Sequence, residues 1–153
     1  MAQDLSSVPL GRNASINRNT GAAFGTVTWV AIPNIQDVTL TSARAKGDVS
    51  VRGSEFKQYV MGQRDVAVTF SLVLVKADAG YQALRDAHIA GTPLQLAVLD
   101  EAATVSGAYG LNADWHVDEF SPGQPLDDGI KFDVKLCMAK TVNAPAAITI
   151  AGA

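Results

Sequence analysis

Three side chains capable of metal binding or acid–base chemistry lie close together in the sequence. Asp114, His116 and Asp118 are spaced at i, i+2 and i+4, which places all three on one face of a β-strand. Two carboxylates beside an imidazole could bind a divalent metal or position a general base. Side chains two residues apart on a strand lie about 7 Å apart, so one metal ion would require them to converge. The solvent-facing side of an amphipathic strand has the same pattern, and we favour that interpretation.

The other residues that could do chemistry have simpler explanations. Asp127 and Asp128 precede Gly129, and Asp before Gly is typical of a tight hairpin turn. His88 falls on a predicted helix, where packing or a hydrogen bond explains it better than catalysis. Cys137 is the only cysteine, which excludes an internal disulfide and a cysteine-based zinc cluster. The sequence has neither a G-x-x-x-x-G-K phosphate loop nor a G-x-S-x-G nucleophile motif, so we predict no enzyme activity, no cofactor and no metal.

The composition predicts a single soluble domain. The chain has 153 residues, of which 48% are hydrophobic and 18% charged, so it has the size of one domain and is too apolar to be disordered. Its net charge of −3 argues against a free-standing nucleic-acid-binding protein. No signal sequence is visible, and no stretch reaches the roughly 18 apolar residues of a membrane helix. We therefore expect a protein that does not bind membranes and stays in the cell that makes it until it is released.

Short alternating segments predict a mainly β fold. Alternation of apolar and polar residues is typical of half-buried antiparallel strands. Strands are predicted at residues 26–32, 35–41, 65–75, 94–99, 111–117, 130–138 and 148–150. One amphipathic helix is predicted over residues 78–90, with Asp78 as its N-cap and Gly91 as its stop. The expected architecture is a β-sandwich or barrel-like domain with one flanking α-helix.

Two segments fall outside the strand pattern. Residues 1–24 are polar and are predicted to form an N-terminal arm, followed by a single β domain over residues 25–153. Residues 42–57 have too few apolar side chains to cover a core and are predicted to form a long loop, and loops of that length are usually functional or disordered. This loop is net basic in an otherwise acidic chain, since it contains Arg44, Lys46, Arg52 and Lys57 together with Asp48 and Glu55.

The order of elements resembles that of a known family. In chain order the matching segments are GSEFKQYVMGQRD at 53–65, the helix DAGYQALRDA at 78–87, GTPL at 91–94, LAVLD at 96–100, G-x-x-G at 107–110, W-x-V-x-x-F at 115–120 and DGIKFDV at 128–134. Over about residues 26–136 this order is similar to that of the tail tube (major tail) proteins of long-tailed bacteriophages.

The resemblance implies a subunit that forms hexameric rings, which stack into a hollow tube for DNA. In that family the inner sheets of six subunits join into a barrel around the channel, and a long loop reaches toward the neighbouring ring. The implied partners are other copies of the chain, the tape-measure, tail terminator and tail-tip proteins, and DNA that passes through the lumen without specific binding. The implied location is the virion tail, with the host cytoplasm before assembly. The tube protein of contractile tails or of type VI secretion shares the fold and remains an alternative.

The resemblance also implies two sets of site residues. The loop at 42–57 matches the family's stacking loop, and the predicted inter-ring residues are Arg44, Lys46, Asp48, Arg52, Glu55 and Lys57. Their candidate partners are acidic turns of a neighbour, at residues 100–101 or 127–128. A lumen for passing DNA should not bind phosphate, and the candidate lining residues are Asp37, Asp114, Asp118 and Asp133, mixed with Lys131 and Lys135. The sequence fits the alternative equally well, that these residues lie on the outer surface of the tube.

A ligand-binding module is the alternative from a different class of function. In a carbohydrate-binding β-sandwich, Trp29 and Trp115 would be exposed platforms. Both have apolar neighbours on their strand faces, which favours burial.

Overall fold

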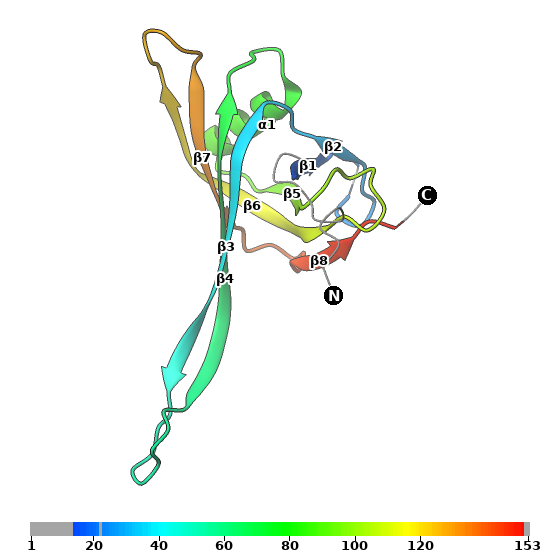
Figure 1. Ribbon diagram of the computed structural model, residues 1–153. Helices are drawn as coiled ribbons and strands as arrows, with labels where there is room; N and C mark the ends of the chain where they lie inside the picture. Colours follow the sequence, from blue (N-terminus) through cyan, green and yellow to red (C-terminus); the bar gives the residue numbers. More distant parts are fainter. Residues whose placement is uncertain (1–13, 22, 152–153) are drawn as a thin grey trace, which may run out of the picture.

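The computed structural model describes residues 14–21 and 23–151, and its strands form one antiparallel sheet (Figure 1). The elements are β1 (Ser15–Asn19), β2 (Trp29–Ala31), β3 (Ile35–Asp48), β4 (Tyr59–Val73), α1 (Ala79–Ala90), β5 (Leu94–Leu99), β6 (Tyr109–Gly123), β7 (Lys131–Met138) and β8 (Ala146–Thr149). The strand order is β2-β1-β5-β6-β7-β4-β3, and β8 pairs with β6. The predicted mainly β fold with one flanking helix is confirmed for the described residues.

The long strand β6 connects two halves of this sheet. Its first half pairs with β5 as far as Trp115, and the second half, from Trp115 to Gly123, pairs with β7. A bulge between Val117 and Glu119 interrupts the register, and bulges bend and twist a strand. The β5-β1-β2 half therefore crosses the β7-β4-β3 half at a large angle (Figure 1). One curved sheet thus forms both layers of a sandwich-like body.

The core lies between these halves and the helix. The inward faces predicted for β4, β6 and β7 are confirmed, because their alternating apolar side chains are buried: Val66, Val68, Phe70 and Leu72, then Leu111, Ala113, Trp115 and Val117, then Phe132, Val134 and Leu136. The Trp115 indole is fully buried, and its N–H donates to the Leu96 carbonyl over 3.1 Å. Trp115 is therefore a core residue and not a ligand platform.

Helix α1 begins and ends as its sequence predicts. Asp78 accepts a hydrogen bond from Gly80 N over 3.0 Å at the N-cap, and Gly91 has the left-handed φ of 67° at the C-cap. The helix packs against β6, and His88 Nδ1 lies 2.9 Å from the Val117 carbonyl at the β6 bulge. The interpretation of His88 as a packing and hydrogen-bonding residue is confirmed. In the described residues no helix has the length and apolar character needed to cross a membrane.

The predicted N-terminal arm is wrong for residues 15–19, which form β1. This strand lies between β2 and β5, with Ile16 and Asn17 buried. The alternation was missed because one buried residue is polar: the Asn17 amide donates to Ser15 Oγ over 2.8 Å. Residues 1–13 of the predicted arm lie outside the described residues.

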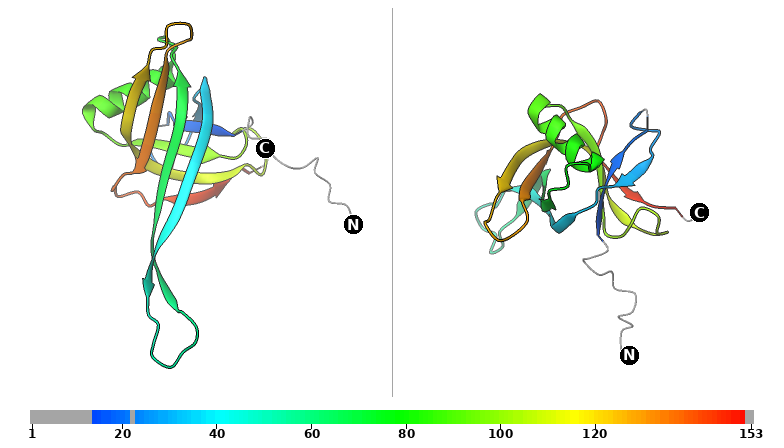
Figure 2. Two further views of the ribbon diagram at one scale, coloured as in Figure 1. Left: turned by 60° about the vertical axis from the view of Figure 1, so that its left-hand side comes forward. Right: turned by 90° about the horizontal axis from the view of Figure 1, so that it is seen from above.

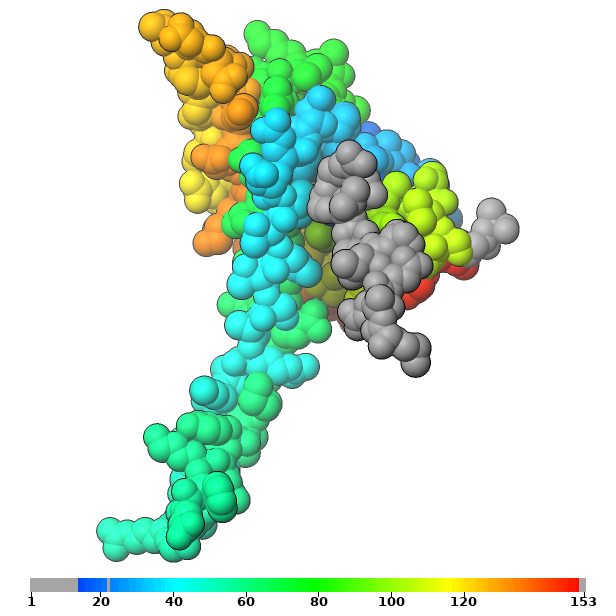
Figure 3. Space-filling model, viewed as in Figure 1, coloured from blue at the N-terminus to red at the C-terminus, as the bar shows by residue number. Residues whose placement is uncertain are grey.

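The predicted loop at 42–57 begins too early, because residues 42–48 belong to strand β3 and only residues 49–57 of it lie outside the strands. Strand β3 continues to Asp48 and β4 begins at Tyr59, and these two residues are register partners. We call residues 42–64 the projecting hairpin and residues 49–58 its tip. The hairpin extends away from the body (Figures 1 and 3). Since neither side of it meets a core, it needs no apolar alternation, and its polar sequence is also typical of a loop.

Candidate assembly surfaces

Four strands present a polar face on the side of the sheet away from the core. Strands β6, β7, β4 and β3 lie side by side (Figure 2, left). Across them, Lys135 is the register partner of Thr69 and of Glu119, and Asp133 is the partner of Ser71 and Ser121. The Ser71 hydroxyl donates to Asp133 Oδ1 over 3.3 Å. We call this surface, which consists of small, hydroxyl and charged side chains, the polar face.

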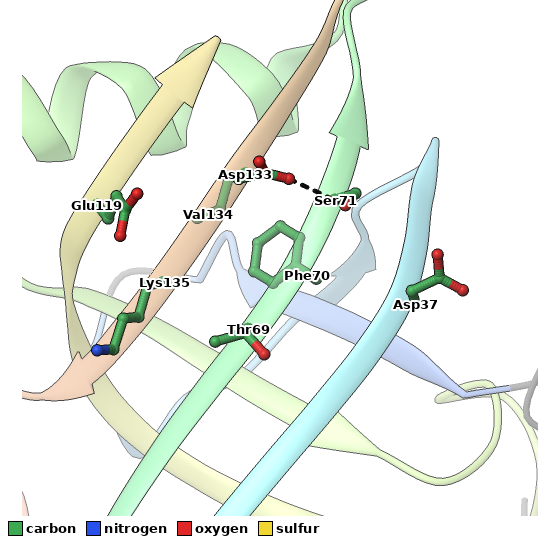
Figure 4. Close-up of a pocket in the computed structure, with 8 residues that line it drawn as sticks. All are labelled: Asp37, Thr69, Phe70, Ser71, Glu119, Asp133, Val134 and Lys135. Atoms are coloured by element: carbon green, nitrogen blue, oxygen red, sulfur yellow. Dashed lines mark hydrogen bonds between the residues drawn. The ribbon is translucent and has the colours of Figure 1, made fainter. Parts of the chain in front are cut away.

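A shallow depression on the polar face brings two of the predicted lumen residues together. It is lined by Asp37, Thr69, Phe70, Ser71, Glu119, Asp133, Val134 and Lys135 (Figure 4). Asp37 has a positive φ of 53°, at the bulge where β3 shifts register between Gln36 and Thr39, and Asp is among the residues that tolerate this conformation. Asp37 and Asp133 therefore face the same depression from β3 and β7.

The other two predicted lumen residues lie elsewhere along β6. Asp118 is exposed at the β6 bulge. Asp114 is partly buried, and its Oδ2 accepts hydrogen bonds from Thr141 Oγ1 over 2.7 Å and from Asn143 Nδ2 over 3.0 Å. Asp114 therefore holds the segment after β7 against β6, a structural role that sequence spacing did not indicate.

The Asp114, His116 and Asp118 triple does not converge. Among the described residues no group of three or more His, Cys, Asp or Glu side chains is placed to hold a metal ion. Partial burial, and secondarily the charge of Asp118, raise the pKa of the neighbouring Cys137 thiol. A raised pKa lowers the thiolate fraction at neutral pH, which agrees with the interpretation of Cys137 as an incidental thiol.

The predicted stacking residues all lie on the projecting hairpin. Arg44 is the register partner of Arg64, and its Nη1 donates to the Gly62 carbonyl over 3.2 Å. Lys46 Nζ lies 4.7 Å from the centroid of the Tyr59 ring. Hydrogen bonding by the Ser50 side chain, and secondarily by Ser50 N, which donates to Asp48 Oδ1 over 2.8 Å, lowers the pKa of Asp48. The remaining three, Arg52, Glu55 and Lys57, lie in the tip and are exposed.

The hairpin also exposes apolar side chains that the sequence analysis missed as a site. Their exposed fractions are 48% for Val49, 64% for Val51, 76% for Phe56, 58% for Val60 and 58% for Met61. Apolar side chains gathered on a surface mark an interaction site more often than single ones do. The sequence does indicate this site, because large apolar residues occur in a segment that has too few of them to cover a core.

Another exposed apolar residue lies at the opposite end of the molecule. Leu126 in the β6–β7 loop is 98% exposed. Asp127 and Asp128 follow it in the seven-residue connection, 124–130, between the register partners Gly123 and Lys131, so the predicted tight turn at 128–129 is a longer hairpin loop. Within it, Gly129 N donates to Asp128 Oδ1 over 2.8 Å. That hydrogen bond, and Lys131 at 3.5 Å, lower the pKa of Asp128. In Figure 1 this loop is at the top and the hairpin tip is at the bottom.

The four-stranded polar face has two free edges. Strand β3 is the last strand of the sheet and has only β4 as a neighbour in the described part of the chain. On the other side β6 loses its β5 neighbour after Trp115, so residues 119–123 pair only with β7 within that part. Free edges expose unpaired N–H and C=O groups that can bind a further strand.

Comparison with known proteins gives agreement at the level of the fold. No family model matches the chain, and no curated protein matches it. The tail of an empty gene transfer agent particle, refined with helical and C6 symmetry, superposes with a TM-score of 0.70 at 14% identity, over 98% of this chain and 100% of that one. The SPP1 tail tube gives a TM-score of 0.73 at 12% identity, over 93% of this chain and 80% of that one.

The chain has the fold of tail tube proteins. A structure of the anti-feeding prophage baseplate is also similar, with a TM-score of 0.56 at 9% identity over 98% of this chain and 99% of that one. All of these are structures of tail or baseplate assemblies. The tail tube resemblance is therefore confirmed for the fold, and the ligand-binding module has no support among these structures.

Proposed function

We propose that this protein is a structural subunit of a virion tail tube, in which hexameric rings stack around a channel for the genome. The fold shared with the tail of a gene transfer agent and with the SPP1 tail tube supports this assignment. The observation on which it depends is the polar face with a free strand edge on each side.

Ring closure follows from the directions of the edge strands. Three antiparallel pairings separate β6 from β3, so these two edge strands run in opposite directions. When a subunit is rotated about the tube axis, its β6 edge meets the β3 edge of the next subunit in antiparallel orientation. Such a head-to-tail contact closes into a ring when the rotation angle divides the circle. The joined sheets then have every edge paired, as in a closed barrel.

The polar face supplies the channel lining. Asp37, Glu119 and Asp133 provide negative charge, and Lys131 and Lys135 provide positive charge. A lining of mixed sign has no excess of cations to neutralise DNA phosphates. Asp118 lies at the margin of this lining, whereas the hydrogen bonds of Asp114 give that residue a structural role.

The projecting hairpin forms the contact between stacked rings. It extends beyond the body (Figure 3), and it contains the six charged residues predicted for stacking, four of them basic.

The tape-measure, tail terminator and tail-tip proteins would contact the finished tube or its ends. Before assembly the subunit would be in the host cytoplasm.

A contractile or related injection system is the second candidate. The similarity to the anti-feeding prophage baseplate structure favours it. The two candidate functions differ in whether a contractile sheath surrounds the tube. The residues of this chain would have the same roles in both.

Negative-stain electron microscopy of the purified full chain tests the proposed function. We expect rings with sixfold symmetry, or tubes with a central channel. Monomers at every protein concentration, including high concentrations that favour association by mass action, would contradict it.

A further inference from the structure

We propose that the tip of the projecting hairpin binds the β6–β7 loop of a subunit in the next ring, so that Arg52 and Lys57 lie against Asp127 and Asp128, and Phe56 lies against Leu126. This inference rests on the proposed tube function and identifies the partner surface of the hairpin.

The positions of the two surfaces support a head-to-tail contact. The hairpin tip and the β6–β7 loop extend from opposite ends of the molecule, beyond the strands of the polar face (Figures 1 and 3). A translation along this long direction brings the tip of one copy to the loop of another. A contact between two different surfaces, repeated by translation, does not close and builds a filament.

The charges of the two surfaces are complementary. The tip contains Arg52 and Lys57 with one acid, Glu55, whereas the loop from 124 to 129 contains Asp127 and Asp128 and no basic residue. Asp127 has neither a hydrogen bond nor an ion pair with any other described residue. Asp128 has a lysine at 3.5 Å that is itself 41% exposed. Complementary charges select a partner and its orientation more than they add affinity.

Both surfaces also expose a large apolar side chain beside these charges. Phe56 is 76% exposed in the tip and Leu126 is 98% exposed in the loop. Charged residues around an apolar centre are the usual arrangement of a protein interface. The proposed stacking contact therefore has an apolar centre, formed by Phe56 and Leu126, in addition to its charge pairs.

The alternative acidic turn at residues 100–101 fits less well. It lies at the side of the body near β8 and not at the end opposite the hairpin (Figure 1). Asp100 Oδ1 already accepts a hydrogen bond from Tyr109 N over 2.8 Å. This turn provides the matched control in the experiment.

Charge exchange between the two surfaces tests the contact. The tip variant combines Arg52→Glu with Lys57→Glu, and the loop variant combines Asp127→Lys with Asp128→Asn, which keeps the acceptor for Gly129 N. We expect each variant to form rings but to give at least about tenfold less sedimentable tube, because every subunit of a ring repeats the lost contact. The combination of both variants should restore tube to within about twofold of wild type.

Three outcomes would overturn the inference while leaving the tube function intact. They are wild-type amounts of tube from either variant, no recovery in the combination, or recovery when the tip variant is combined with Glu101→Lys in place of the loop variant. Failure of the wild-type chain to form rings or tubes would instead refute the proposed function, and the inference with it.

Cross-linking provides a second measurement that does not depend on the amount of tube. In a Cys137→Ser background, Phe56→Cys with Leu126→Cys should form intermolecular disulfides under mild oxidation and give a ladder of oligomers, since a disulfide requires Cα atoms about 4.4–6.8 Å apart. The control pairs Phe56→Cys with Val142→Cys, another fully exposed apolar position. A ladder of equal yield in the control, or none in the test pair, would contradict the contact.

Discussion

Removal of the projecting hairpin should abolish stacking and leave the fold intact. The variant replaces residues 45–63 with Asn-Gly, a two-residue turn that joins the register partners Arg44 and Arg64. Every residue removed is exposed, so the core loses no contact. An isolated two-stranded hairpin is at best marginally stable in water, and its deletion therefore removes little free energy of unfolding.

Two small terms set the magnitude. The exposed Lys46–Tyr59 cation–π contact is lost at a cost of about 0.5–1 kcal/mol. Shortening of the loop contributes about 0.6 kcal/mol of stabilisation for each halving of its length. The net change in the free energy of unfolding should stay within about 2 kcal/mol, which corresponds to a shift in Tm of less than about 8 °C for a domain of this size.

Thermal unfolding followed by circular dichroism measures the fold, and sedimentation with electron microscopy measures assembly. Leu72→Ala serves as the control for a core defect, because Leu72 is fully buried and such truncations cost about 2–5 kcal/mol. A fall in Tm of more than about 15 °C in the deletion variant would show that the hairpin stabilises the domain. Tubes of normal length from that variant would refute its role in stacking.

Three further predictions concern the body of the subunit. Trp115→Ala should lower the free energy of unfolding in urea by about 3–5 kcal/mol, because a fully buried aromatic side chain is lost. Asp114→Ala should lower the free energy of unfolding by about 1–3 kcal/mol because Thr141 and Asn143 lose their acceptor. Asp114→Asn should lower it by less. Added divalent metal should not change the melting temperature of the wild type. The Cys137 thiol, whose pKa is raised by burial, should react with a disulfide reagent more slowly at pH 8 than a free cysteine peptide and reach half its maximal rate at a higher pH; a faster reaction would contradict its assignment as an unreactive thiol.

Most of the body could be predicted from the sequence because its strands have one face in a core. Burial of every second residue imposes the period of two that identifies β4, β6 and β7. The caps Asp78 and Gly91 fix the ends of the helix through local hydrogen bonding and a left-handed φ.

The errors arose where long-range contacts decide the structure. The sequence pattern does not show strand β1, because the buried Asn17 interrupts the apolar pattern and the strand β5 with which it pairs lies far along the chain. The projecting hairpin has no core to impose a pattern, so backbone pairing alone defines it. The role of Asp114 depends on residues 141 and 143, which only the folded chain brings near it.

A three-dimensional reconstruction of the assembled protein by electron cryo-microscopy tests the central claim most directly. We expect a tube of sixfold rings in which β3 of each subunit pairs with β6 of the next, and in which Asp37, Asp133 and Lys135 face the channel. A tube in which α1 faces the channel and the polar face lies outside, or an assembly without a channel, would contradict the account.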